Sequence, residues 1–140
     1  MRARALEVPA GAGAEYCLRT GSVGIGAGVG DRDARRLHRF AMVREGAFVW
    51  TRDRAGAYRL GRIAGDVRAV RSAEAARVGI THVRPARWLH RAFAEAEVPA
   101  AVAQTFARGG RNFQRTHDVE AERLTAELWE AGAVAGRRRR

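Results

Sequence analysis

One segment, FVWTRDRAGAYRLGRIAG from Phe48 to Gly65, limits the possible folds of this chain more than any other. Two hydrophobic runs, residues 47–51 and 57–65, flank the turn sequence RDRAG. Two such runs separated by a short stretch that contains glycine are typical of a β-hairpin. Folding alone does not require the tryptophan, the tyrosine and the four arginines of this segment, so it is also a candidate for function; the arginines are Arg52, Arg54, Arg59 and Arg62.

Weaker patterns on either side of the hairpin indicate the other elements. Val23 and Ile25 alternate with glycine, which favours a strand with a close neighbour. Pro85 interrupts THVRPARWLH, so we expect two strand pieces, Thr81–Val83 and Ala86–Leu89, around a kink or edge. The remaining expected elements are a first strand at Arg4–Val8, a helical turn closed by Gly21, and helices over Asp31–Val43, Val98–Gly110 and Val119–Gly132.

Together these elements predict an α+β protein. Short strands in the middle of the chain, with helices before and after them, point to a small β-barrel of about five to six strands. Helices would cover its mouth or edges, and the amphipathic segment Val119–Gly132 would be the C-terminal helix. We expect a single domain over residues 1–134, followed by a disordered basic tail over residues 135–140.

The charge of the chain favours a polyanionic partner. All 26 basic residues are arginine and only 15 residues are acidic, so the formal net charge is +11. A basic surface gains affinity for nucleic acid by releasing counterions from the phosphates, although it can also dock an acidic protein. One side of the predicted helix Asp31–Val43 is either a solvated face or a phosphate-contacting face; its arginines are Arg32, Arg35, Arg36 and Arg39.

Other classes of function find little support. Cys17 is the only cysteine, which excludes an internal disulfide and favours a buried apolar role. We expect no metal, no cofactor and no enzymatic activity, because zinc-ligand spacing, a GxGxxG loop and a nucleophile setting around Ser22 or Ser72 are all missing. The first residues lack the apolar core of a secretory signal, and no stretch approaches the roughly 20 apolar residues of a membrane span. We therefore expect a cytoplasmic protein without a membrane partner.

The order of the motifs resembles a known family. VGIG, VREGAFVWT, YRLGRIAG, HVRPARWL and TF-x-x-GGRNFQR follow one another between Val23 and Arg115. This order is similar to the small N-terminal domain of some Mrr-type restriction endonucleases and of related defence proteins. The layout is also similar, more loosely, to the PUA-like superfamily, which includes the EVE and YTH domains. A D…E-x-K nuclease motif is impossible without lysine, so the resemblance implies a reader of nucleic acid without its cutter.

A PUA-like fold implies a β-barrel with a pocket for a modified or flipped base. Aromatic faces hold such a base while polar groups reach its edge. The residues carried over to that pocket are Trp50, Trp88, Arg62, Asp66, His82, Asn112 and Gln114. The arginines expected on the neighbouring phosphates are Arg52, Arg54, Arg59, Arg87, Arg108, Arg111 and Arg115. The alternative is structural: the tryptophans would be core, His82 a hydrogen-bonded strand residue, and Gly109–Gly110 a helix cap.

Two functions therefore stay open at this stage. In the first, the protein reads a modified or flipped base in DNA, in preference to RNA, and a separate effector protein does any cutting. In the second, the protein is a basic adaptor or regulator that binds another protein and touches nucleic acid only non-specifically. An enzyme is the third and least supported interpretation, because no paired catalytic groups are evident.

Overall fold

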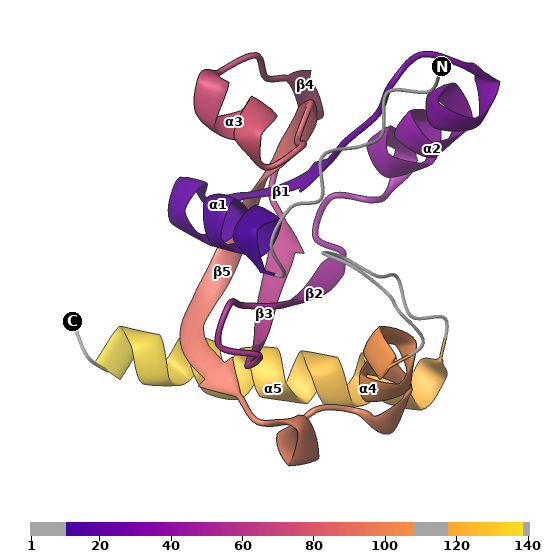
Figure 1. Cartoon of the computed structure of the whole chain (residues 1–140). Helices are drawn as coiled ribbons and strands as arrows, with labels where there is room; N and C mark the ends of the chain where they lie inside the picture. The colour runs from indigo at the N-terminus through magenta and orange to yellow at the C-terminus, as the bar shows by residue number, and fades with distance from the viewer. Residues whose placement is uncertain (1–10, 108–117, 139–140) are drawn as a thin grey trace.

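The chain folds into a curled antiparallel sheet of five strands with helices around it, as the computed structural model describes for residues 11–107 and 118–138 (Figure 1). The strands are β1 (Ser22–Ile25), β2 (Phe48–Arg52), β3 (Tyr58–Ile63), β4 (Arg68–Ala69) and β5 (His82–Phe93). The helices are α1 (Ala12–Thr20), α2 (Asp31–Met42), α3 (Ala73–Arg77), the 3₁₀ turn η1 (Glu95–Glu97), α4 (Ala100–Ala107) and α5 (Val119–Arg138). The α+β class is confirmed, and the sheet forms a half-barrel.

The predicted hairpin is confirmed as β2 and β3. Trp50 lies opposite Leu60 in the register of this pair. Asp53 organises the turn, because its backbone N–H donates to the carbonyl of Ala57 while its carboxylate accepts from the Ala57 N–H at 3.0 Å. Gly56 completes the turn with a φ of +87°, a left-handed conformation that glycine adopts without strain. The hairpin occupies one side of the sheet, whose order is β1-β5-β3-β2, with β4 also paired to β5.

A single long strand, β5, replaces the two strand pieces expected around Pro85. Its first residues pair with β1 on one side and with β4 on the other, and its second half pairs with β3. The pairing with β4 ends at Val83, and the pairing with β3 begins at Ala86. Pro85 therefore lies at the break between the two partner strands, where its missing N–H leaves no ladder bond unmade. The Pro85 carbonyl on that side still accepts from the Ala64 N–H at 2.8 Å.

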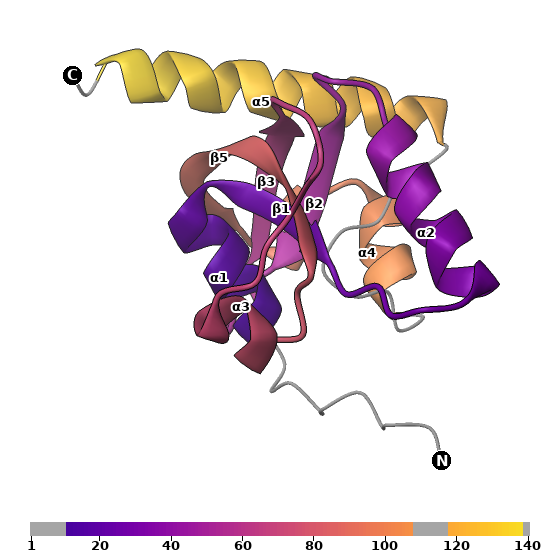
Figure 2. The same cartoon turned by 90° about the horizontal axis from the view of Figure 1, so that it is seen from above.

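The hydrophobic core is divided by the sheet. One face carries Trp50, Tyr58, Leu60, Leu89 and Phe93. Val98 and two residues of α4, Val102 and Phe106, complete this cluster, and Leu128 and Trp129 of α5 pack against it. The other face carries a smaller cluster to which α2 contributes only Phe40 as a buried residue: Val23, Ile25, Val49, Ile63 and Ala86. In Figure 2, α5 runs along one side of the sheet and α2 stands at its outer flank. The two helices therefore serve the sheet in different ways.

The C-terminal helix is longer than expected. The sequence pattern predicts an end at Gly132, but α5 continues to Arg138, so residues 135–138 of the expected disordered tail are helical. Gly132 does not end the helix because it serves packing: a Cβ there would lie 2.6 Å from Cδ1 of Leu89. Ala133 and Ala135 follow, and their good helix propensity favours continuation of the helix.

Three smaller expectations have mixed outcomes. Gly21 closes α1 in the left-handed conformation, with its N–H donating to the Cys17 carbonyl, as predicted. The strand expected at Arg4–Val8 lies outside the described residues. Along the described ranges, no helix has both the length and the apolar composition needed to cross a bilayer.

Candidate nucleic-acid interface

The charges of this protein are segregated between two parts of the fold. Residues 31–91 contain fifteen arginines and six acidic residues. By contrast, the ranges 95–107 and 118–130 contain seven acidic residues and one arginine, Arg123. In Figure 1 the helices α2 and α3 of the first set stand at the top, and η1, α4 and α5 of the second set lie at the bottom. Residues 31–91 thus form a basic half, and residues 95–107 and 118–130 form an acidic half, beyond which α5 continues to Arg137 and Arg138.

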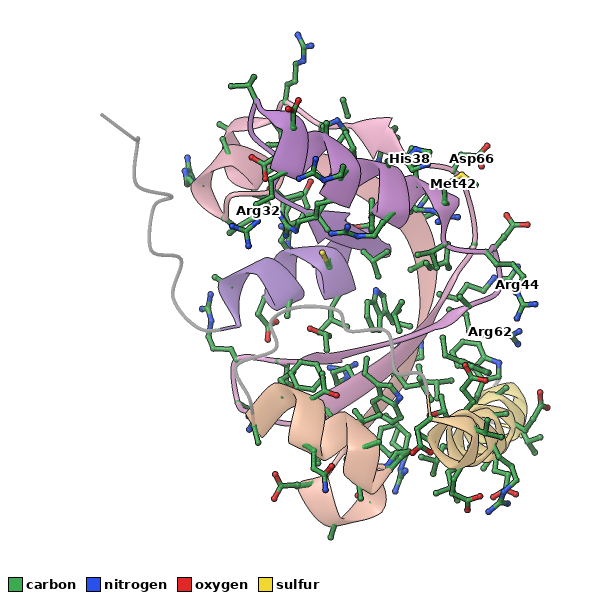
Figure 3. The ribbon with its side chains drawn as sticks, turned by 90° about the vertical axis from the view of Figure 1, so that its right-hand side faces the viewer. Arg32, His38, Met42, Arg44, Arg62 and Asp66 are labelled. Carbon is green, nitrogen blue, oxygen red and sulfur yellow. The ribbon has the colours of Figure 1, made fainter. Side chains whose placement is uncertain are left out.

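Helix α2 carries the densest group of exposed arginines. Phe40 is its only buried residue, and the arginines Arg32, Arg35, Arg36 and Arg39 are exposed. Arg36 is turned back to donate to the carbonyl of Gly26, whereas no ion pair within the described residues involves Arg32, Arg35 or Arg39. Figure 3 looks onto the side of the molecule where Arg32, His38, Met42 and Arg44 are displayed.

A buried arginine from β5 holds α2 in place. Arg84 is only 3% exposed, yet its guanidinium faces carbonyls rather than a carboxylate. Its Nη1 donates to Phe40 at 3.0 Å and to Val43 at 2.5 Å, and its Nε donates to Gly65 at 2.9 Å. The positive charge therefore sits at the negative end of the α2 dipole and binds carbonyls that the helix leaves unpaired. Sequence reasoning does not find Arg84, because a strand position between Val83 and Pro85 carries no signal for a cap on a distant helix.

The first expected pocket wall, Trp50, is core. Its side chain is 3% exposed, its ring packs edge-on against Phe93, and its Nε1 donates to Oγ1 of Thr125 on α5 at 3.2 Å. An indole that is enclosed on its ring and satisfied at its N–H has no surface to offer a ligand. Trp50 therefore connects the sheet to α5, and its expected role as a base-stacking wall is wrong.

The second expected wall, Trp88, lies on the other face of the sheet. Trp88 pairs with Gly61, and Trp50 pairs with Leu60, so successive positions of β3 place the two indoles on opposite faces. Trp88 packs against the backbone of Gly61 and donates from Nε1 to the Ser22 carbonyl at 2.9 Å. The two rings cannot form one pocket. Trp88 is nevertheless half-buried rather than enclosed, and it borders a hollow of about 380 Å³.

The hollow beside Trp88 lies between the end of α1 and the second half of β5. Its lining consists of Leu18, Arg19, Thr20, Gly21, Arg59, Trp88, Leu89 and His90. Arg19 at its edge forms an ion pair with Glu74, and Arg59 reaches across the floor. The hollow thus has one aromatic face and two guanidinium groups.

Most of the hairpin arginines have structural partners. Arg59 fills the irregularity where the β3–β5 register shifts, and its Nη2 donates to the carbonyls of Leu89 and His90. Arg52 donates to the Gly56 carbonyl and lies over the ring of Tyr58. Arg62 donates to Gly46 and stacks between Phe48 and Trp129. Arg54 is exposed, and its backbone N–H donates to the carboxylate of Glu15. The contacts of the arginines in the segment 48–65 are therefore largely structural.

The remaining expected site residues do not gather around either tryptophan. Asp66 and Arg87 are exposed, and His82 shares a hydrogen bond of 2.9 Å between its Nδ1 and Thr81 Oγ1. His82 lines a separate apolar groove of about 460 Å³ between α2 and β4, together with Leu37, His38 and Val67. The other predicted residues lie outside the described residues: Arg108, Arg111, Asn112, Gln114 and Arg115.

The described part of the chain assembles no cluster of metal-binding side chains. Residues 11–107 and 118–138 bring together no set of three or more His, Cys, Asp or Glu side chains that would hold a metal ion. Burial raises the pKa of the Cys17 thiol to about 11, which keeps it protonated and unreactive at neutral pH. Comparison of the chain with protein-family models, with curated proteins and with solved structures gave no match.

Proposed function

We propose that this protein is a non-catalytic nucleic-acid-binding module whose basic half holds the phosphate backbone, with DNA as the preferred partner. The segregation of charge carries this proposal. An arginine that is paired with a carboxylate is neutralised locally, whereas Arg32, Arg35 and Arg39 have no such partner among the described residues. Unpaired guanidinium groups on one side of a molecule are the footprint expected for a polyanion.

A binding titration at several salt concentrations tests the proposal. Each phosphate neutralised on duplex DNA contributes about −0.9 to the slope of log affinity against log salt. Four to six contacts therefore predict a slope of roughly −4 to −5 for the intact chain. An affinity for DNA that does not change with salt would contradict the proposal. Tight binding of an acidic protein by a chain that fails to bind DNA would favour the adaptor function instead.

Recognition of a modified or flipped base is the second candidate, and the hollow beside Trp88 favours it. The hollow of about 380 Å³ offers the aromatic face of Trp88, with Arg19 and Arg59 beside it, each already paired with a carboxylate of the protein. Stacking of one base on an aromatic ring is worth about 1–3 kcal/mol. This proposal keeps the PUA-like architecture implied by the resemblance, but it uses one indole in place of the expected two.

Replacing Trp88 by phenylalanine separates base reading from backbone binding. The smaller ring retains part of the packing on Gly61 but has less stacking surface and lacks the N–H that donates to Ser22. We expect a reduced preference for a modified over a plain oligonucleotide, and an unchanged salt slope. The thermal unfolding midpoint of the variant shows whether its fold is intact. An equal affinity of the native chain for both oligonucleotides would leave backbone binding as the whole function.

A further inference from the structure

One side of helix α2 has no described helix or strand packed against it. It spans twelve residues from Asp31 to Met42, so its length is about 18 Å. Phe40 is buried and Leu37 is half-buried, and both lie on the side that faces the sheet. No described helix or strand lies against the opposite side in Figure 1 or Figure 2, where α2 stands at the outer edge.

The residues on the free side form a ridge. Arg35 stands about 200° around the helix from Leu37 and Asp33, so it lies at the crest. Arg32 and Arg39, at i−3 and i+4, both lie beside it on the same flank, rotated from Arg35 by about 40–60°. Met42, which is 68% exposed, extends the crest at the C-terminal end of the helix. A large exposed methionine in line with three guanidinium groups is a surface that packing of the described core does not require.

The dimensions and chemistry of this ridge match the major groove of B-form DNA. The groove is about 12 Å wide and admits an α-helix, whose diameter with side chains is about 10–12 Å. Arginine forks onto the O6 and N7 acceptors of guanine, and an apolar side chain contacts the methyl group of thymine. Guanidinium groups beside the crest reach the phosphates along one side of the groove.

Resting on the proposed function, we propose that α2 is the DNA-reading element of this protein and that it enters the major groove of duplex DNA. Arg35 and Met42 at the crest contact base edges, and Arg32 and Arg39 contact phosphates or bases beside them. Arg84 acts as a positioning residue, because it holds the C-terminal carbonyls of α2 and so sets the angle of the helix. The same helix does not fit duplex RNA, whose major groove is deep and narrow.

The experiment measures the affinity of the intact chain for four fluorescently labelled probes of one base sequence. The probes are a plain DNA duplex, the duplex with every cytosine glucosylated on a 5-hydroxymethyl group, the duplex saturated with a minor-groove-binding polyamide, and the RNA duplex. Glucose fills the major groove, so we expect it to lower the affinity at least 10-fold, whereas the polyamide leaves the affinity unchanged. The RNA duplex should bind at least 10-fold more weakly than plain DNA. Equal affinity for the plain and glucosylated duplexes, tighter binding to the glucosylated one, or competition by the polyamide would each overturn the proposal.

Two glutamine variants connect the groove to the helix. Arg35→Gln removes one guanidinium from the crest, and Arg123→Gln removes one from the acidic half, where Arg123 is paired with Glu120 and Glu127. We expect Arg35→Gln to lower the affinity for the plain duplex about 5- to 100-fold, since a good base contact discriminates by that much. Arg123→Gln should change it less than 2-fold.

The outcomes separate this inference from the proposed function. One outcome is that the native chain and the variants Arg35→Gln, Arg32→Gln and Arg39→Gln all bind DNA equally and in a salt-dependent way. That result retains the proposed function but rules out α2 as the reading element. Failure of the native chain to bind any probe rules out both. Arg32, Arg35 and Arg39 are exposed, and circular dichroism of each variant confirms that its helices are intact.

Discussion

Helices α2 and α5 are both amphipathic and both carry charged residues, but they relate to the sheet in opposite ways. α5 buries Ala121 and Thr125 and packs Leu128 and Trp129 against the aromatic core. Arg123, in the first half of α5, is held between two glutamates one turn away on either side. The charges of Glu120, Arg123 and Glu127 are thus paired within the helix itself.

α2 is attached at fewer points and leaves its charges free. Phe40 is its one buried residue, and the guanidinium of Arg84 binds its C-terminal carbonyls. Three of its arginines have no carboxylate partner among the described residues. A helix that pairs its charges internally serves the fold, whereas a helix that leaves like charges aligned on an exposed side must meet its counter-charges elsewhere.

The largest expected effect comes from breaking the attachment of α5. Trp50→Ala removes an indole that packs on Phe93 and donates to Thr125, and it leaves a cavity between the sheet and the helix. Such a change costs about 3–5 kcal/mol of unfolding free energy. Denaturant titration followed by circular dichroism measures the loss. Trp50→Phe, which retains part of the ring contact, should lose less, and an unchanged midpoint for Trp50→Ala would contradict the packing of α5 on the sheet.

The next effect concerns the attachment of α2. Arg84→Met keeps most of the volume of the side chain but removes the donors to Val43 and Gly65. Each buried acceptor left without a donor costs about 1–3 kcal/mol, so we expect a loss of about 2–6 kcal/mol for the two. Relative to the native chain, the variant should show a larger increase in amide hydrogen exchange in α2 than in α5. Equal acceleration in both helices would mean that Arg84 supports the whole core rather than α2.

A glycine pair in α5 tests how closely that helix lies on β5. Gly132→Ala places a methyl group 2.6 Å from Cδ1 of Leu89, so the leucine or the helix must move. We expect a destabilisation of about 1–3 kcal/mol, as for other overpacked positions. Gly136 is the matched control, because no atom of the described residues lies within 4 Å of the place that an alanine methyl group would take there. Gly136→Ala should stabilise the helix by about 0.5–1 kcal/mol, and thermal unfolding distinguishes the two signs.

The sequence is informative where one pattern determines one element. Alternation and a turn predict the β2–β3 hairpin, and the 3.6-residue period predicts α2 and α5. The sequence is less informative where the position of a side chain depends on how two strands pair. Trp50 and Trp88 both lie in strand patterns, but only the register, with Leu60 and Gly61 as their respective partners, places them on opposite faces.

Other features escape sequence reasoning because their causes lie far away in the chain. Gly132 looks like a helix cap until Leu89 is placed beside it. Arg84 looks like another surface arginine until the end of α2 is found against it. The residues of the candidate site differ from those expected from the sequence for the same reason. Net charge predicts a polyanionic partner, but only the fold shows which arginines have structural partners and which are left on the ridge of α2.

The smallest expected effect concerns the charge network of α5. Hydrogen bonding to Arg123 lowers the pKa of Glu120 below its usual value of 4.5. A carboxyl group with a depressed pKa in the folded state stabilises the protein above its unfolded pKa, and this contribution is lost as the pH falls through the folded value. Arg123→Gln should therefore lower the thermal midpoint slightly at pH 7 and low salt, since exposed ion pairs contribute little. The difference from the native chain should vanish in acid below the folded-state pKa of Glu120, and also in high salt. A difference that persists at low pH would mean that Arg123 acts through packing of its aliphatic stem rather than through charge, and α5 would then resemble α2 more closely in having a cation without a working partner.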